Sequence, residues 1–214
     1  MTADHLIEAG LIAIIRADSS DHLIDAARAL WEGGVRAMEV TLNTPGALKS
    51  IEQIRDKMPE MICGAGTILQ VDDAVAASHA GAQFIITPTL QLDTVAFCKG
   101  QGLPVSPGCT SPTEMLAGQR AGADFIKVFP ANRFGLEHIA AVLRVMPQLK
   151  LVPTGGVTPD NVHRYFEVGC PMVAAGATLV SKQVIAQRDW PALTALAQRF
   201  TSAVAAARKA SEGR

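Results

Sequence analysis

The sequence predicts one α/β domain over residues 1–214, folded as a (β/α)8 barrel with a short N-terminal helix. Three observations lead to this prediction. Short apolar runs alternate with amphipathic stretches along the chain. Successive runs lie roughly 20 to 25 residues apart, the length of one βα unit with short loops. No linker or low-complexity segment interrupts the series, which favours a closed parallel barrel over the alternative, an open doubly wound sheet.

Strands are predicted at the apolar runs, and helices where apolar residues recur with a helical period. The expected strands are 11–16, 37–42, 61–67, 84–88, 104–109, 125–130, 149–155 and 172–179. The expected helices after the first short one are 21–32, 46–57, 71–79, 92–99, 112–121, 136–145, 159–168 and 190–209. Helix N-caps are expected at Ser20, Ser111 and Thr158, and helices should stop at Gly33, Gly81, Gly102, Gly122 and Gly169.

The charge and cysteine content argue against several classes of function. With a formal net charge of −1, the chain lacks the basic excess that favours binding to nucleic acids or anionic membranes. No apolar run is long enough to span a bilayer and no signal peptide is evident, so a cytoplasmic protein is expected. The four cysteines lack ligand spacing and the five histidines form no cluster, so no metal site is expected.

Two predicted strands place charged residues on a face that a parallel barrel usually keeps apolar. In 37–42, alternation sends the large apolar residues outward against the helices and points Glu39 and Thr41 inward. In 125–130, Lys127 shares its face with two phenylalanines. An unpaired ammonium group in such a place is costly, so a lysine there requires an explanation.

Lys127 is a candidate nucleophile, because removal from water favours the neutral amine that attacks carbonyl groups. The alternatives are an outward lysine whose side chain passes between the helices, or a buried ion pair with Glu39. A paired carboxylate could still move protons. A charged Glu39 would favour the ammonium form instead, and the sequence leaves open which effect prevails.

Polar residues and glycines gather where the predicted strands end, the side on which barrel enzymes place their sites. The polar positions at these ends are Arg16, Thr67, Thr87 and Thr154. Gly155 and Gly156 precede the helix 159–168, and Gly176 follows the last strand. Glycine lets backbone N–H groups approach an anion, and a helix N-terminus adds a favourable dipole. A phosphate site is therefore predicted after the last two strands.

Six segments occur in the order typical of one known family. They are 12–16, Glu-Val-Thr-Leu at 39–42, Gly-Ala-Gly-Thr at 64–67, 107–114, Lys-Val-Phe-Pro-Ala at 127–131 and Pro-Thr-Gly-Gly-Val at 153–157. With them, the chain from about residue 6 to 182 resembles the 2-keto-3-deoxy-6-phosphogluconate (KDPG) aldolases, which also act on 4-hydroxy-2-oxoglutarate (KHG).

The resemblance implies a class I aldolase, a homotrimer of TIM barrels that needs no cofactor. Lys127 would form a Schiff base and Glu39 would act as general acid and base. Arg16, Thr67 and Lys127 would hold the carboxylate end of the pyruvyl group. The other substrate-binding residues would be Thr41, Asn43, Pro88, Phe129 and Thr154, and the phosphate would be held by Gly155, Gly156, Gly176 and the backbone of Ala177.

Three positions bear on which substrate is used. Asn43 stands where many gluconate-type members carry arginine, and galactonate-directed relatives also carry asparagine there. Thr154 agrees with the gluconate type, whereas the galactonate-directed relatives tend to carry valine. Ala177 replaces a common serine, which removes one hydroxyl donor to the phosphate. The gluconate compound is expected as the main substrate, and the galactonate epimer is the alternative.

The expected reaction cleaves the phosphorylated keto-deoxy sugar acid to pyruvate and D-glyceraldehyde 3-phosphate, and KHG to pyruvate and glyoxylate. One alternative is a metal-dependent pyruvate aldolase, although its carboxylate and histidine ligands are not evident. Another is a barrel that binds or isomerises a sugar phosphate without a covalent intermediate. A purely structural role would leave an inward Glu39 and Lys127 unexplained.

Overall fold

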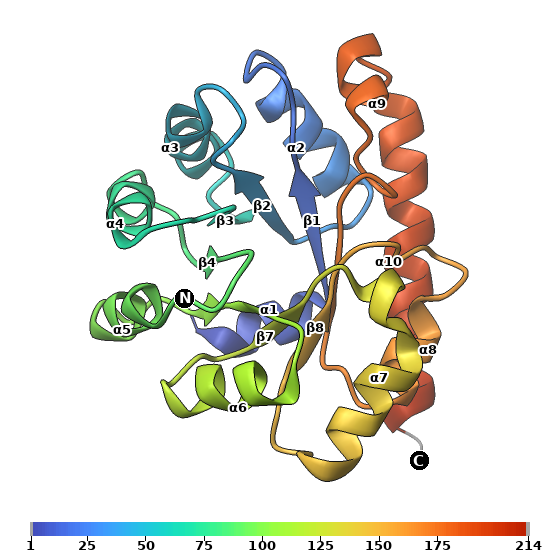
Figure 1. The fold of residues 1–214 in the computed structure, drawn as a ribbon. Helices are drawn as coiled ribbons and strands as arrows, with labels where there is room; N and C mark the ends of the chain where they lie inside the picture. The colour runs from blue at the N-terminus through green and yellow to red at the C-terminus, as the bar shows by residue number, and fades with distance from the viewer. Residues whose placement is uncertain (1, 213–214) are drawn as a thin grey trace.

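A computed structural model describes residues 2–212, in which helices surround a set of parallel strands (Figure 1). Met1 and residues 213–214, which belong to the expected domain 1–214, lie outside the described residues. The strands are β1 (Leu11–Ile15), β2 (Ala37–Thr41), β3 (Ile62–Gly66), β4 (Ile85–Ile86), β5 (Val105–Ser106), β6 (Gly108–Cys109), β7 (Ile126–Val128), β8 (Leu151–Pro153) and β9 (Val173–Ala175).

The helices follow the predicted order and include the short first helix. They are α1 (Ala3–Ala9), α2 (Leu23–Glu32), α3 (Ala47–Lys57), α4 (Val71–His79), α5 (Leu92–Gly100), α6 (Pro112–Arg120), α7 (Ala131–Val145), α8 (Val162–Glu167), α9 (Lys182–Gln187) and α10 (Trp190–Glu212). The sequence did not predict α9, which Ser181 caps by accepting a hydrogen bond from the N–H of Val184.

Some of the predicted boundaries are wrong. Ser111 caps α6 as expected, and its box with Glu114 satisfies the free N–H groups of the first turn. The caps expected at Ser20 and Thr158 are not formed, because α2 begins after His22 and α8 after Asn161. The predicted strand 172–179 ends at Ala175, where the chain turns and the carbonyl of Gly176 accepts two backbone N–H bonds.

Six strands form one parallel sheet in the order β5-β4-β3-β2-β1-β9, and β6-β7-β8 form a second. Two features connect these sheets. Only Pro107 separates β5 from β6, and a parallel bridge pairs Thr154, after β8, with Ala174 of β9. The single strand expected at 104–109 is therefore two short strands, since proline has no N–H to continue a ladder.

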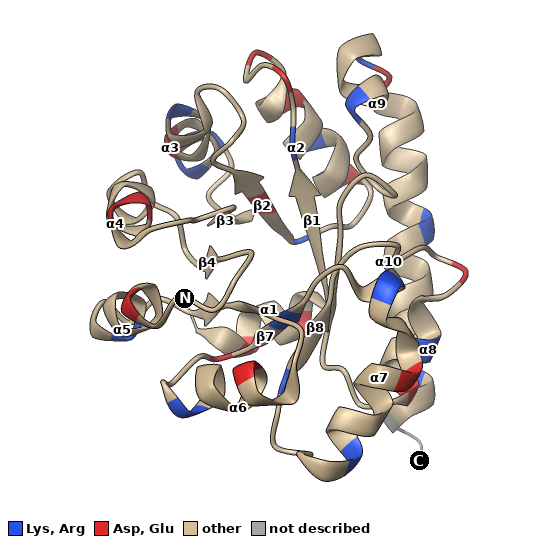
Figure 2. Cartoon of the chain, in the orientation of Figure 1, with Lys and Arg blue, Asp and Glu red and all other residues tan. Residues whose placement is uncertain are grey.

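The buried apolar side chains form two clusters on opposite faces of the strands. The larger cluster lies between strands and helices and includes Met38 and Val40. The smaller one includes Ala37 of the same strand together with Phe84, Phe125 and other inward residues, and Leu6 of α1 joins it. Neighbours on β2 thus alternate between the clusters, as predicted for 37–42. Figure 2 shows that most charged positions lie on helices and loops, whereas β2 carries an acidic one.

Candidate active site

Glu39 lies in the middle of β2 and is fully buried, with 0% of its side chain exposed. Neither carboxyl oxygen has a hydrogen-bond partner among residues 2–212. Burial raises the pKa of this carboxyl above its ordinary value of 4.5, and the positive charges of Lys127 and Arg16 oppose that rise. A buried carboxyl group without a partner is costly for folding and is therefore typical of a functional site.

The space for this carboxyl group comes from Gly66, the last residue of β3. A Cβ atom built on Gly66 would lie 1.6 Å from Oε1 of Glu39 and 2.2 Å from its Cδ. Position 66 therefore excludes every side chain while Glu39 holds this rotamer. Gly66 is not among the predicted site residues, although a glycine inside a strand signals the close approach of another group.

Lys127 lies in β7 and is 8% exposed. Its Nζ is 5.3 Å from the centre of the Phe129 ring, and its side chain lines an interior cavity with Phe84, Phe125 and Met172. The alternative of an outward lysine is therefore wrong. Among residues 2–212 no ion pair joins Lys127 to a carboxylate, so the alternative of a buried ion pair is not formed either. No ion pair or hydrogen bond joins Lys127 to Glu39, although the charge of Lys127 opposes the rise in the pKa of Glu39.

Arg16 and Thr67 meet although 51 residues separate them. Arg16 follows β1 and is exposed, and its Nη2 donates a hydrogen bond of 3.5 Å to Oγ1 of Thr67, which follows β3. Thr67 adopts a φ of 59°, in the left-handed region that is unfavourable for a β-branched residue. Such strain is common at functional sites, where the surroundings hold the backbone in place. The guanidinium group of Arg16 thus lies where the strands end, and its positive charge acts on the carboxyl group of Glu39.

The other predicted substrate-binding residues differ in the exposure of their side chains and in whether their hydroxyl groups already donate a hydrogen bond. Thr41 is buried and its hydroxyl donates to the carbonyl of Ile15 at 3.1 Å, so that proton is already used. Thr154 is 3% exposed and donates to the carbonyl of Val152 at 3.3 Å. Asn43, Pro88 and Phe129 retain exposed surface, and 41% of Phe129 is accessible.

The predicted phosphate loops lie at the ends of two neighbouring strands. Gly155 and Gly156 have φ values of 96° and 74°, which glycine adopts without strain. Asn161 fixes this loop, because its amide donates to the carbonyl of Gly156 at 2.9 Å and its Oδ1 accepts from the N–H of Thr158. The bridge between Thr154 and Ala174 brings the second loop, Gly176 and Ala177, beside the first.

Within the part of the chain that the structure describes, no group of three or more histidine, cysteine or acidic residues is arranged to hold a metal ion. The four cysteines are buried and free. None of the described helices is both long and apolar enough to cross a membrane.

Comparison with known proteins identifies one family of enzymes. The sequence matches the family profile "KDPG and KHG aldolase" over residues 3–196. It is 35% identical to a 2-dehydro-3-deoxy-phosphogluconate aldolase of Treponema pallidum, covering 88% of this chain and 90% of that protein. It is 32% identical to a 2-dehydro-3-deoxy-6-phosphogalactonate aldolase of Escherichia coli, covering 91% and 96%.

A solved structure resembles the fold over most of its length. The KDPG aldolase from Legionella pneumophila, with pyruvate captured as a covalent carbinolamine, has a TM-score of 0.83 at 29% identity, covering 91% of this chain and 96% of that one. A lysine and a carboxyl group buried within parallel strands, together with these likenesses, define an aldolase. The chain belongs to the KDPG and KHG aldolase family.

Proposed function

We propose that the protein is a class I aldolase that cleaves 2-dehydro-3-deoxy-6-phosphogluconate to pyruvate and D-glyceraldehyde 3-phosphate, and KHG to pyruvate and glyoxylate. The observation that carries this proposal is a lysine in the interior of the strands, near a buried carboxyl group that has no partner of its own. Membership of the family and the pyruvate carbinolamine in the Legionella relative support it.

The reaction uses Lys127 as the nucleophile. Its neutral amine adds to the C2 carbonyl of the substrate, and loss of water gives an iminium ion that accepts electrons from the C3–C4 bond. Glu39 takes the proton of the C4 hydroxyl as that bond breaks, and the aldehyde leaves. The same carboxyl group returns the proton to C3 of the enamine, and hydrolysis releases pyruvate. A raised pKa suits a carboxyl group that must exchange protons in both directions.

Two groups position the ends of the substrate. Arg16, aligned by Thr67, offers a cation to the pyruvyl carboxylate. Gly155, Gly156, Gly176 and the backbone of Ala177 offer N–H groups to the phosphate at the far end. Binding at both ends fixes C2 near the amine, which accelerates addition.

The galactonate epimer is the second candidate substrate. Asn43 is exposed at the end of β2, so its amide is free to contact a substrate hydroxyl. The Escherichia coli relative that is named for phosphogalactonate is 32% identical to this chain. Comparing kcat/KM for the two epimers decides between them.

The remaining expectations concern assembly. We infer that the two sheets close into one (β/α)8 barrel in a single domain, because Pro107 joins β5 to β6 and the bridge of Thr154 with Ala174 joins β8 to β9. We also propose a cytoplasmic homotrimer, for which family resemblance is the support. Sedimentation equilibrium of the purified chain tests the trimer.

The central test is borohydride reduction in the presence of pyruvate, followed by peptide mass spectrometry. We expect a stable adduct on Lys127 in the native chain and none in Lys127→Ala, which should also lose cleavage activity. Lys150→Ala is the matched control, since Lys150 also approaches a phenylalanine ring, at 5.9 Å from Phe125, but is exposed. Absence of an adduct on folded native protein would favour the non-covalent sugar-phosphate barrel. Loss of activity with a chelator would favour the metal-dependent aldolase.

A further inference from the structure

Two residues have buried side-chain polar atoms that lack a hydrogen-bond partner among residues 2–212. One is Glu39, whose carboxyl group is explained by proton transfer to the substrate. The other is Ser106, the last residue of β5, which is 4% exposed. A buried hydroxyl without a partner destabilises a fold, so an unpaired serine requires a partner that is absent from the chain itself.

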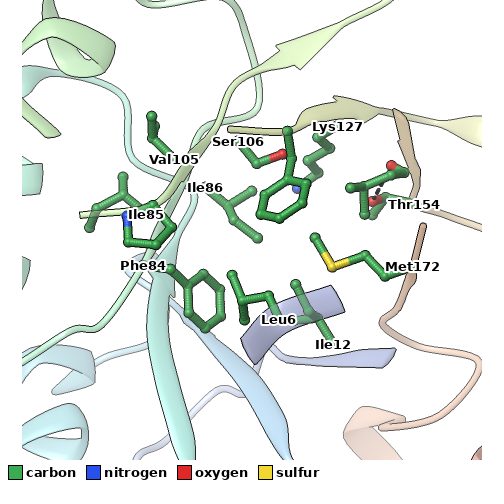
Figure 3. A pocket seen from close by; sticks show the side chains of 13 residues that line it. Leu6, Ile12, Phe84, Ile85, Ile86, Val105, Ser106, Lys127, Thr154 and Met172 are labelled. Carbon is green, nitrogen blue, oxygen red and sulfur yellow. Dashed lines mark hydrogen bonds between the residues drawn. The ribbon is translucent and has the colours of Figure 1, made fainter. Parts of the chain in front are cut away.

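Ser106 faces the interior of the strands. Its neighbour Val105 belongs to the outer apolar cluster, so alternation turns Ser106 inward. Two residues later, Gly108 pairs with Lys127 across β6 and β7. Both Ser106 and Lys127 line the interior cavity, whose other walls are mostly apolar (Figure 3). Ser106 and Lys127 therefore line the same cavity, and no hydrogen bond joins their side chains.

The cavity is suited to one buried water molecule. Its free space has room for roughly one water between the side chains. Three of the residues that line it have polar side chains: Ser106, Lys127 and Thr154. The proton of Thr154 is directed to the carbonyl of Val152, so its oxygen remains able to accept a hydrogen bond. Buried water in proteins usually has two to four such partners.

We propose that Ser106 is a positioning residue that holds the Lys127 amine through one buried water molecule. The water accepts hydrogen bonds from Ser106 Oγ and from an N–H of Lys127, and donates to Oγ1 of Thr154. With one N–H directed into the cavity, the lone pair and the other N–H are turned away from it, toward the strand ends where the substrate carbonyl arrives. This inference rests on the proposed function of Lys127 and adds no covalent step to it.

The test measures the rate of borohydride trapping with pyruvate, together with kcat and KM for cleavage, in full-length variants. In Ser106→Ala we expect both trapping and kcat to fall about tenfold, the effect of losing roughly one hydrogen bond in a dry site. KM should change little, because Ser106 does not contact the substrate. Ser106→Cys keeps the volume but hydrogen-bonds weakly, so it should fall as well.

The controls separate this role from packing. Ser50→Ala removes another buried hydroxyl, one in α3 that donates to the carbonyl of Gly46, and should leave trapping unchanged. Thermal unfolding shows whether each variant folds. If Ser106→Cys matches the native chain while Ser106→Ala is slow, or if both keep the native trapping rate, the inference is overturned. If the native chain itself forms no adduct on Lys127, it is the proposed function that fails.

Discussion

Gly66 and Glu39 are matched across neighbouring strands, because the carboxyl group of Glu39 occupies the place that a side chain at position 66 would take. An ideal Cβ on Gly66 would be 1.6 Å from Oε1. The register pairs Thr41 of β2 with Gly66, so the carboxyl group reaches from Glu39 over the end of β3. The glycine lets an acidic side chain remain in an interior that would otherwise exclude it.

Gly66→Ala is expected to reduce cleavage activity by about 10²-fold or more, because the methyl group displaces the proposed general acid and base. Steady-state kinetics measures this effect. Gly100→Ala is the control, since a Cβ at position 100 in α5 meets no atom within 4 Å. It should retain native activity. Native kinetics in Gly66→Ala would contradict the proposed placement of the Glu39 carboxyl.

Glu39→Gln is expected to lose turnover while it still forms the pyruvate adduct. It should also be more stable than the native chain at neutral pH. The pKa of Glu39 is raised in the folded state, so its contribution to stability is fully present below the unfolded pKa near 4.5 and is lost as pH rises through the folded pKa. Denaturant unfolding as a function of pH measures the difference between the two proteins. A difference that does not grow from pH 4.5 to neutral pH would count against a raised pKa.

Gly156→Ala is expected to raise KM for the phosphorylated substrate more than for KHG, which has no phosphate. The new Cβ would lie 2.5 Å from Cβ of Asn132, at a φ of 74° that alanine adopts with strain. Gly102→Ala carries similar backbone strain, at a φ of 66°, but its Cβ meets nothing within 4 Å. It should therefore lose stability and keep its KM. Equal KM changes for both substrates would argue against a phosphate loop here.

Ala177→Ser is expected to lower KM for the phosphorylated substrate by about tenfold, the effect of roughly one added hydrogen bond to a charged group. Ala177 is exposed beside Gly176, so a hydroxyl fits without repacking. Kinetics with KHG provide the comparison, since KM for that substrate should not change. An equal improvement for both substrates would place the new hydroxyl elsewhere than at the phosphate.

Glu114→Gln is expected to destabilise the protein by about 1 kcal/mol at neutral pH, the usual effect of weakening a helix cap. Backbone and hydroxyl hydrogen bonds from Ser111 and Thr110 lower the pKa of Glu114 from 4.5 to about 2. A lowered pKa gives stability that is present above the unfolded value and lost as pH falls from about 4.5 to about 2. The two proteins should therefore become similar in stability at low pH, as measured by thermal unfolding. A constant gap at all pH values would contradict this origin.

The catalytic candidates could be predicted because strand periodicity is a local property. Alternation along the predicted strand 37–42 pointed Glu39 inward, and along 125–130 it placed Lys127 on the face of two phenylalanines. Only the cavity lined by Lys127 excluded the outward lysine. Strand boundaries were predicted less well. The interruption at Pro107 and the turn at Gly176 depend on which backbone groups find partners on a neighbouring strand.

The sequence by itself determined the alternation of strands and helices, the inward face of Glu39 and the family resemblance. Only the tertiary structure decided that Gly66 makes room for Glu39, that Arg16 meets Thr67, and that Ser106 and Lys127 share one cavity. The physical reason is that periodicity fixes the direction of a side chain, whereas contacts between strands depend on register and curvature. Those are set by the packing of the whole molecule.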